Sequence, residues 1–191
     1  ASRVSTSGMD QAQGGAIANT GTINKISGNF AYNYAENITG FSGRGGAVAN
    51  INGGTISEID GVFIGNTAKF TGGAVYNGAD STINSIKGTF IGNTSEWSGG
   101  AIDSYSAISS IDGTFINNNA VTGNGGAIHK TNSPGSGATQ TDISGTFIGN
   151  KSVFGGGAVS LHFDNEKYSN NNNDKKSTVS GTFIGNSSNS N

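Results

Sequence analysis

The 191-residue chain has no cysteine, one proline, one leucine, and no apolar run of the ~20 residues that would span a bilayer. Without cysteine there is no disulfide framework and no thiolate metal site. A single leucine excludes a leucine-rich helical bundle. The missing apolar run predicts no direct membrane insertion by this segment.

An excess of charge of one sign is also missing. Ten basic residues, only two of them arginine, stand against twelve acidic residues, and the formal net charge is −2. Recognition of nucleic acid or of anionic lipid needs a basic patch. The sequence therefore predicts neither partner.

Glycine, asparagine and β-branched residues are abundant instead. The chain has 33 glycines, 25 asparagines, and 27 residues that are isoleucine or valine. β-Branched residues favour strands. A low apolar content is also typical of disordered chains, but those chains carry a high net charge. Composition leaves an all-β fold and disorder open, and pattern must decide between them.

Two short motifs alternate strictly along the chain and favour an ordered repeat protein. Gly-Gly-Ala followed by Ile or Val begins at Gly14, Gly45, Gly72, Gly99, Gly125 and Gly156. Phe-x-x-Asn pairs Phe30 with Asn33, Phe63 with Asn66, Phe90 with Asn93, Phe115 with Asn118, Phe147 with Asn150 and Phe183 with Asn186. A third element, Ile-x-x-Ile-x-Gly, lies between them in the first four repeats.

The spacing of the repeats predicts the fold. Successive motif alanines are 31, 27, 27, 26 and 31 residues apart, and each unit has three short apolar segments separated by Gly, Asn, Ser or Thr. Three short strands per coil are typical of a parallel β-helix, whose coils stack at ~4.8 Å. We expect one all-β domain: a lead-in over 1–13, six coils of about 27 residues over 14–186, and a truncated tail over 187–191, within a longer array.

Stacking would give the repeated residues structural roles. Strand alternation places the Phe-x-x-Asn phenylalanines on one face, so Phe30, Phe63, Phe90, Phe115, Phe147 and Phe183 are expected to form an internal aromatic ladder. The motif asparagines Asn33, Asn66, Asn93, Asn118, Asn150 and Asn186 are expected either to form a second ladder of side-chain amides or to be solvated turn residues.

Alternating Gly-Gly-Ala-[Ile/Val] and Phe-x-x-Asn from Gly14 to Asn186 resemble the repeats of the chlamydial polymorphic outer-membrane proteins and related autotransporter passenger domains. The resemblance implies a right-handed β-helical passenger, displayed by a C-terminal membrane barrel and used for adhesion to host cells or for self-association. This sequence contains no such barrel, and it lacks the cysteines that chlamydial members often carry.

Two rows of side chains contain residue types that an enzyme could use, but each row also has a non-catalytic interpretation. The residue after Gly-Gly-Ala-[Ile/Val] is Asp103, His129 and Ser160 in successive repeats, the residue types of a nucleophilic triad. The favoured interpretation is an outward-facing polar row. Likewise, Asp60, Lys87 and Asp112 provide acids and a base, as in β-helical glycoside hydrolases, but are better explained as an exposed ion-pair ladder.

One outward surface is predicted to be regular. Its threonine and isoleucine ranks comprise Thr89, Ile91, Thr114, Ile116, Thr146, Ile148, Thr182 and Ile184. A flat exposed apolar stripe usually marks an interface. We expect a face for packing or lateral association, with ice binding as a weaker alternative.

The last two repeats carry insertions at one corner. They span Thr131–Gln140, which contains Asn132 and Pro134, and His162–Lys176, which contains Phe163 and Tyr168. Solenoids often place binding on such loops. The candidate partner-binding residues are therefore Asn132, Pro134, His162, Phe163 and Tyr168, although tolerated insertions without a binding role are an equal alternative.

These observations predict a non-enzymatic bacterial surface or secreted passenger that needs no cofactor and no metal. It would act as an adhesin for a host-cell protein or glycan, or as a structural stalk that binds copies of itself. The alternative is a carbohydrate-active β-helix enzyme, for which a convergent acidic site would be required.

Overall fold

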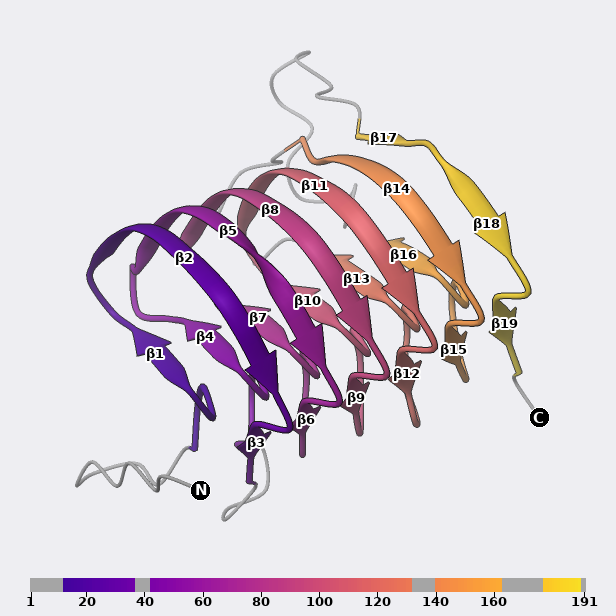
Figure 1. The fold of residues 1–191 in the computed structure, drawn as a ribbon, viewed down its shortest axis with the longest axis horizontal. Helices are drawn as coiled ribbons and strands as arrows, with labels where there is room; N and C mark the ends of the chain where they lie inside the picture. The colour runs from indigo at the N-terminus through magenta and orange to yellow at the C-terminus, as the bar shows by residue number, and fades with distance from the viewer. Residues whose placement is uncertain (1–11, 37–41, 132–139, 163–176, 190–191) are drawn as a thin grey trace.

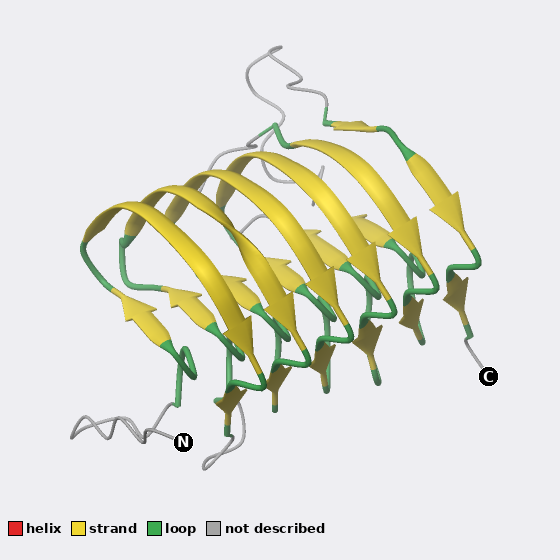
Figure 2. Ribbon diagram, viewed as in Figure 1, coloured by secondary structure: helices red, strands yellow, loops and turns green. Residues whose placement is uncertain are grey.

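The computed structural model describes residues 12–36, 42–131, 140–162 and 177–189 as an all-β column in which the chain winds through three parallel sheets (Figure 1). No described residue is helical (Figure 2). Each of the first five coils contributes one strand to each sheet, and the sixth contributes two strands to the second sheet and one to each of the others. The predicted parallel β-helix is confirmed.

The three sheets differ in strand length. The first sheet contains β1 (Ile17–Asn19), β4 (Val48–Asn50), β7 (Val75–Asn77), β10 (Ile102–Ser104), β13 (Ile128–Thr131) and β16 (Val159–His162). The second contains β2 (Thr22–Ala31), β5 (Thr55–Ile64), β8 (Thr82–Ile91), β11 (Ala107–Ile116), β14 (Asp142–Ile148), β17 (Thr178–Val179) and β18 (Thr182–Ile184). The third contains β3 (Tyr34–Ala35), β6 (Thr67–Ala68), β9 (Thr94–Ser95), β12 (Asn119–Ala120), β15 (Lys151–Ser152) and β19 (Ser187–Ser188).

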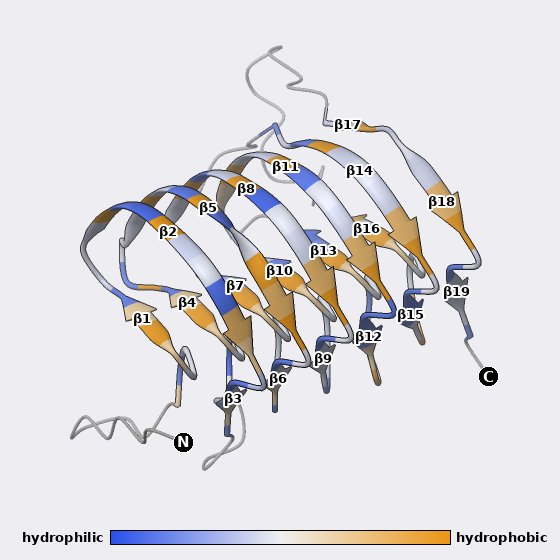
Figure 3. Ribbon diagram, viewed as in Figure 1, coloured by the Kyte–Doolittle hydropathy of each residue, from blue (hydrophilic) through white to orange (hydrophobic). Residues whose placement is uncertain are grey.

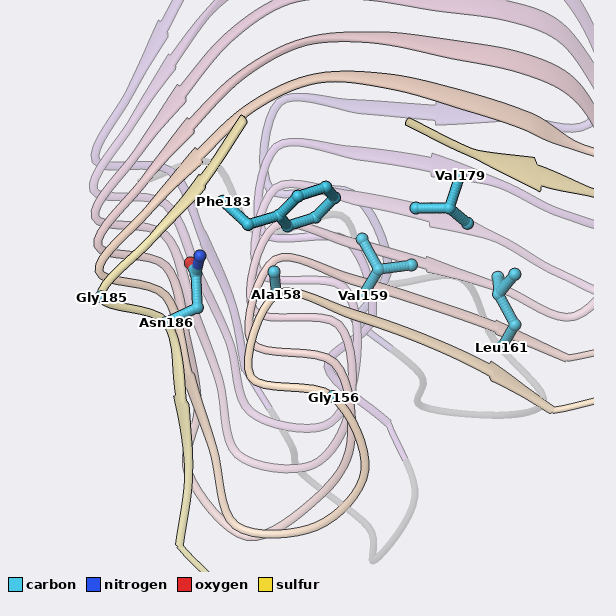
Figure 4. A pocket seen from close by; sticks show the side chains of 8 residues that line it. All are labelled: Gly156, Ala158, Val159, Leu161, Val179, Phe183, Gly185 and Asn186. Atoms are coloured by element: carbon cyan, nitrogen blue, oxygen red, sulfur yellow. The ribbon is translucent and has the colours of Figure 1, made fainter. Parts of the chain in front are cut away.

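The column is right-handed. Figure 4 looks along it from the end that carries the last coil, which lies nearest the viewer. The chain runs from Val159 toward Leu161, returns overhead from Val179 to Phe183, and descends to Asn186, which is an anticlockwise path that advances toward the viewer. The handedness implied by the resemblance therefore agrees with the structure.

The second sheet differs from the sequence-based prediction of short strands. The Ile-x-x-Ile-x-Gly segment and the following Phe-containing segment form one continuous strand of 10 residues in β2, β5, β8 and β11. The glycine between the two segments bends the strand without ending it. In β8 this residue is Gly88, whose φ of 123° is rarely adopted by residues with a side chain.

The phenylalanines form a continuous stack inside the column. Neighbouring rings have centroids 4.7–5.0 Å apart and planes within 8° of parallel, from Phe30 through Phe63, Phe90, Phe115 and Phe147 to Phe183. The four middle rings are fully buried, while Phe183 at the last coil is 47% exposed. Buried isoleucines and the motif alanines complete the same core.

The motif asparagines form a second stack at the turn between the second and third sheets. In each coil from Asn33 to Asn150, the side-chain amide donates to the Oδ1 atom of the next asparagine at 2.8–3.0 Å. From Asn66 to Asn186 it also donates to the carbonyl oxygen of a phenylalanine in the preceding coil. The amides thus satisfy backbone groups that the turn leaves unpaired.

The paired glycines make the corner before the first sheet. Gly99 has a φ of 65°, in the left-handed region that side chains disfavour. A Cβ atom on its neighbour Gly100 would lie 2.5 Å from the backbone nitrogen of Asn119 in the same coil. Because the turn needs one residue in a left-handed conformation and one without a side chain, Gly-Gly recurs in every repeat.

The predicted ion-pair ladder of Asp60, Lys87 and Asp112 is wrong in its partners. Lys87 Nζ lies 3.5 Å from Glu58, and Asp60 lies 3.5 Å from Lys25. Asp112 instead accepts a hydrogen bond from the Ser144 hydroxyl. Lys and Glu side chains are long enough to reach diagonally across the strands, so strand register alone did not identify the pairs.

Candidate functional site

The outer side of the first sheet carries the row predicted to be polar and exposed. Strand register aligns Tyr76, Asp103, His129 and Ser160 on successive coils. Their exposure contradicts the prediction, because Asp103 is fully buried, Tyr76 is 6% exposed and His129 is 8% exposed. Only Ser160 is half-buried. Neighbouring side chains of the row and of the adjoining turns cover these residues.

Asp103 and His129 form a buried pair at the centre of this row. His129 Nδ1 lies 2.7 Å from Asp103 Oδ1. Nε2 is therefore the ring nitrogen that does not face the carboxylate. Asp103 Oδ2 is buried without a hydrogen-bond partner among the described residues. The carboxylate thus fixes the orientation of the ring and the nitrogen that it presents.

Aromatic rings and a guanidinium enclose the pair on the side of the earlier coils. The Arg44 guanidinium carbon lies 5.3 Å from the ring centroids of both Phe70 and Tyr76. Tyr105 packs edge-on against His129 at 6.5 Å. Burial raises the pKa of Tyr76 to about 12, and the Asp103 charge together with burial raises the pKa of Tyr105. Both phenols therefore stay neutral hydrogen-bond donors at physiological pH.

A second row of residues adjoins the outer face of the first sheet. We call this row, Phe70, Trp97, Gly123 and Phe154, the wall. Trp97 N donates to Phe70 O, and Phe154 N donates to Gly123 O, so these residues follow one another along the column. The Trp97 ring packs on Phe70 at 5.4 Å and is 53% exposed. A Cβ atom on Gly123 would lie 2.6 Å from Trp97 O, so the backbone leaves no room for a side chain at this position of the wall.

Asn124 and Ser160 join the wall to the first sheet. A Cβ atom on Gly155 would lie 2.7 Å from Asn124 Oδ1 and 2.7 Å from Ser160 Oγ. These two polar atoms therefore border the same small space beside the wall. Since Ser160 is also in register with His129, a continuous polar surface runs from Asn124 to the buried pair.

The arrangement does not complete a nucleophilic triad. His129 and Asp103 are arranged like the base of a triad and the acid that orients it. However, no hydrogen bond joins His129 to Ser160 among the described residues. A triad needs the nucleophile within hydrogen-bond reach of the base. The geometry is that of a preorganised polar surface with one locked imidazole.

A second polar ladder inside the first sheet was missed in the sequence. Asn19 donates to Asn50, Asn50 to Asn77, and Asn77 to the Ser104 hydroxyl, at 2.8–3.2 Å. Lys130 and Leu161 occupy the next two positions of this rank. The signal was the second residue after Gly-Gly-Ala-[Ile/Val], which is Asn in the first three repeats. The last three repeats have Ser, Lys and Leu at this position, so the pattern is not apparent over the whole chain.

Lys130 gives a test of this buried rank. Its side chain is fully buried, and burial lowers its pKa to about 8. The unfolded chain, with a lysine pKa near 10.5, holds more protons than the folded chain between pH 8 and 10.5, so the free energy of unfolding should rise with pH there. Below pH 8 the buried Lys130 side chain is charged in both states, so its full destabilising contribution to the free energy of unfolding is present.

We therefore expect Lys130→Met to raise the free energy of unfolding at pH 7 by about 1–3 kcal/mol and to flatten its rise toward pH 9.5. Urea unfolding at the two pH values measures both effects. Lys151→Met, at an exposed position of β15, is the control and should keep the slope of the parent. A destabilised Lys130→Met at pH 7 would contradict the assignment.

The predicted association face points outward in the second sheet. Thr89, Thr114, Thr146 and Thr182 align in register, as do Ile91, Ile116, Ile148 and Ile184. These side chains are half-buried in the inner coils and exposed at β18. Figure 3 shows the apolar band that their strand ends contribute along the column.

The predicted binding loops lie mostly outside the described residues. Asn132, Pro134, Phe163 and Tyr168 fall within the undescribed ranges 132–139 and 163–176. His162 ends β16 and is exposed. Since Thr131 pairs with His162 in the first sheet, the two insertions leave the column from neighbouring coils.

A hollow opens at the end of the last coil, lined by Gly156, Ala158, Val159, Leu161, Val179, Phe183, Gly185 and Asn186 (Figure 4). These residues hold the ladder and core positions of the sixth coil, so we assign the hollow to the core. Within the described ranges, no group of three or more His, Cys, Asp or Glu residues could hold a metal ion. In the same ranges, no helix has the length and apolarity to cross a membrane.

Comparison with known proteins matches the repeats themselves. The Chlamydia polymorphic membrane protein repeat matches residues 87–105 and 112–131. Each matched segment runs from the Phe-x-x-Asn strand through the Gly-Gly-Ala corner into the first sheet. No curated protein and no solved structure matches the chain. The predicted resemblance is thus confirmed for these two segments, which are similar to the repeat of the Chlamydia polymorphic membrane proteins, a family displayed at the bacterial surface.

Proposed function

We propose that this segment is the passenger part of a bacterial surface protein and acts by attachment, as an adhesin or as a stalk that binds its own copies. The surface display of the repeat family supports this role. Two continuous internal ladders also suit a rigid element that holds a binding face away from the cell.

The observation that carries the proposal is the Thr/Ile face. Its ranks continue in register through β8, β11, β14 and β18, and strand alternation directs them away from the core. A partly exposed stripe of threonine and isoleucine of this regularity usually marks a surface that a partner covers. Such a repeated, uncharged face suits a protein contact.

A catalytic role has less support. A glycosidase requires two carboxyl groups placed across a scissile bond. On the outer face of the first sheet, Asp103 is the single acid of the aligned row and is already bonded to His129. Ser160 has no hydrogen bond to that imidazole. Attachment without turnover is therefore the function we propose.

Binding to epithelial cells tests the Thr/Ile face. The labelled 191-residue chain should bind saturably, or should self-associate in sedimentation. An Ile116→Lys/Ile148→Lys variant should lose at least tenfold in either affinity, because two desolvated charges oppose the contact. Ser85→Lys, in the same sheet but outside the two ranks, serves as the surface-charge control.

A separate variant shortens Thr131–Gln140 and His162–Lys176 to the length of the other coils. If this variant alone loses cell binding, attachment belongs to the loop corner and the Thr/Ile assignment is wrong. If the parent chain neither binds cells nor self-associates, the proposed function fails. Each variant must keep the melting temperature of the parent chain before its binding is interpreted.

A further inference from the structure

The wall and the outer face of the first sheet form a second surface, separate from the Thr/Ile face. Its exposed or half-buried side chains are Trp97, Phe154, Asn124 and Ser160, and the buried His129 adjoins Ser160. We propose that this surface is a binding site for a neutral oligosaccharide. This inference goes beyond the attachment proposed above and does not depend on it.

The aromatic part of the site is held in place from behind. Trp97 packs on Phe70 at 5.4 Å, and the Phe70 ring lies under the Arg44 guanidinium. The Trp97 side chain is 53% exposed, so part of the indole is open to solvent. A Cβ atom at Gly123 would lie 2.6 Å from Trp97 O, so the backbone itself excludes a side chain there. An exposed, fixed indole face can stack on the apolar C–H face of a sugar ring.

The polar part consists of a fixed imidazole and two polar side chains that lack partners in the part of the chain that the structure describes. The Asp103 carboxylate holds His129 at 2.7 Å, and Tyr105 packs against the ring edge. The side chains of Asn124 and Ser160 have no hydrogen-bond partner among the described residues, and their polar atoms face the space at Gly155. An amide and a hydroxyl supply both donors and acceptors, as sugar hydroxyls require.

Charge decides which kind of sugar fits. Lys69 and Glu96, the charged residues beside Phe70 and Trp97, form an ion pair with each other. Asp103 is bonded to His129, and Arg44 is covered by two aromatic rings. The charged side chains beside the site are therefore paired or covered, so none is left free to attract a sulfated or sialylated glycan. A neutral oligosaccharide matches it best.

The intrinsic fluorescence of the chain reports this site directly, because Trp97 is its sole tryptophan. The full 191-residue chain is titrated with maltohexaose, cellohexaose, chitohexaose, mannopentaose and lacto-N-neotetraose. We expect a saturable change in Trp97 emission with at least one of them, at a dissociation constant between about 10 μM and 1 mM.

Matched variants assign the contacts. Asn124→Ala and Ser160→Ala should each weaken binding by roughly 3- to 10-fold, since each removes one hydrogen bond to the sugar. Val121→Ala, an exposed change on the turn before the wall, should leave the dissociation constant unchanged. Equal affinity in all three variants would overturn the site.

Three further outcomes would also overturn the proposal. One is that the Trp97 emission does not change with any neutral sugar up to about 10 mM, a concentration well above the expected dissociation constants. Another is a response only to sialyllactose or a heparin tetrasaccharide. The third is a response only to a Trp- or Tyr-containing peptide, which would make the occupant a protein. Because no cells are used, failure here leaves the Thr/Ile attachment proposal standing, and the reverse also holds.

Discussion

Replacing Phe115 with alanine should lower the free energy of unfolding by about 3–5 kcal/mol. The ring is fully buried and lies 4.9 Å from Phe90 and 5.0 Å from Phe147. Its removal opens a cavity between two rings whose backbones are fixed by the second sheet, so the coils cannot collapse to fill it. Denaturant unfolding followed by far-UV circular dichroism measures the loss.

Phe183→Ala is the matched control. Phe183 belongs to the same stack but touches one ring and is 47% exposed, so its loss should be near 1 kcal/mol, about the value for partly burying an aromatic side chain. Similar losses in the two variants would show that stacking position does not govern stability. A loss below 1 kcal/mol for Phe115→Ala would contradict the internal ladder.

The fold was predictable because each coil repeats the same physical solution. Gly-Gly marks the corner that needs a left-handed residue, phenylalanine fills the interior, and asparagine closes the turn, so six copies of the pattern average out local ambiguity. Strand length was not predictable. In the sequence Gly88 indicates the end of a strand, but in the structure it only bends β8. A positive φ within a strand leaves no signature that separates a bend from an end.

The candidate site was harder to predict than the fold. Register placed Asp103 beside His129 correctly, but their burial depends on turns that arrive from other coils. No pattern along the chain indicated that Trp97 would adjoin this row, because Trp97 and Asp103 lie on opposite sides of a glycine corner. Repeat periodicity predicts what stacks along the column; it does not predict which side chains meet around one coil.

The asparagine ladder at the turn carries the other large expected effect. Asn118 Nδ2 donates to Phe90 O and to Asn150 Oδ1, and Asn118 Oδ1 accepts from the backbone and side-chain nitrogens of Asn93. The side chain is fully buried, so water cannot replace these bonds. Asn118→Ala should therefore lower the free energy of unfolding by about 3–5 kcal/mol, because several buried groups lose partners at once.

Asn33→Ala provides the comparison within the same ladder. Asn33 is half-buried, and its side chain donates one bond, to Asn66 Oδ1, so its loss should be about 1 kcal/mol. Hydrogen exchange adds a local readout: in Asn118→Ala the Asn93 amide, deprived of its acceptor, should exchange faster than that of Asn66, which keeps Asn93 Oδ1. Equal protection of both amides would mean that the backbone alone holds the turn, and that the recurrence of asparagine must have another cause.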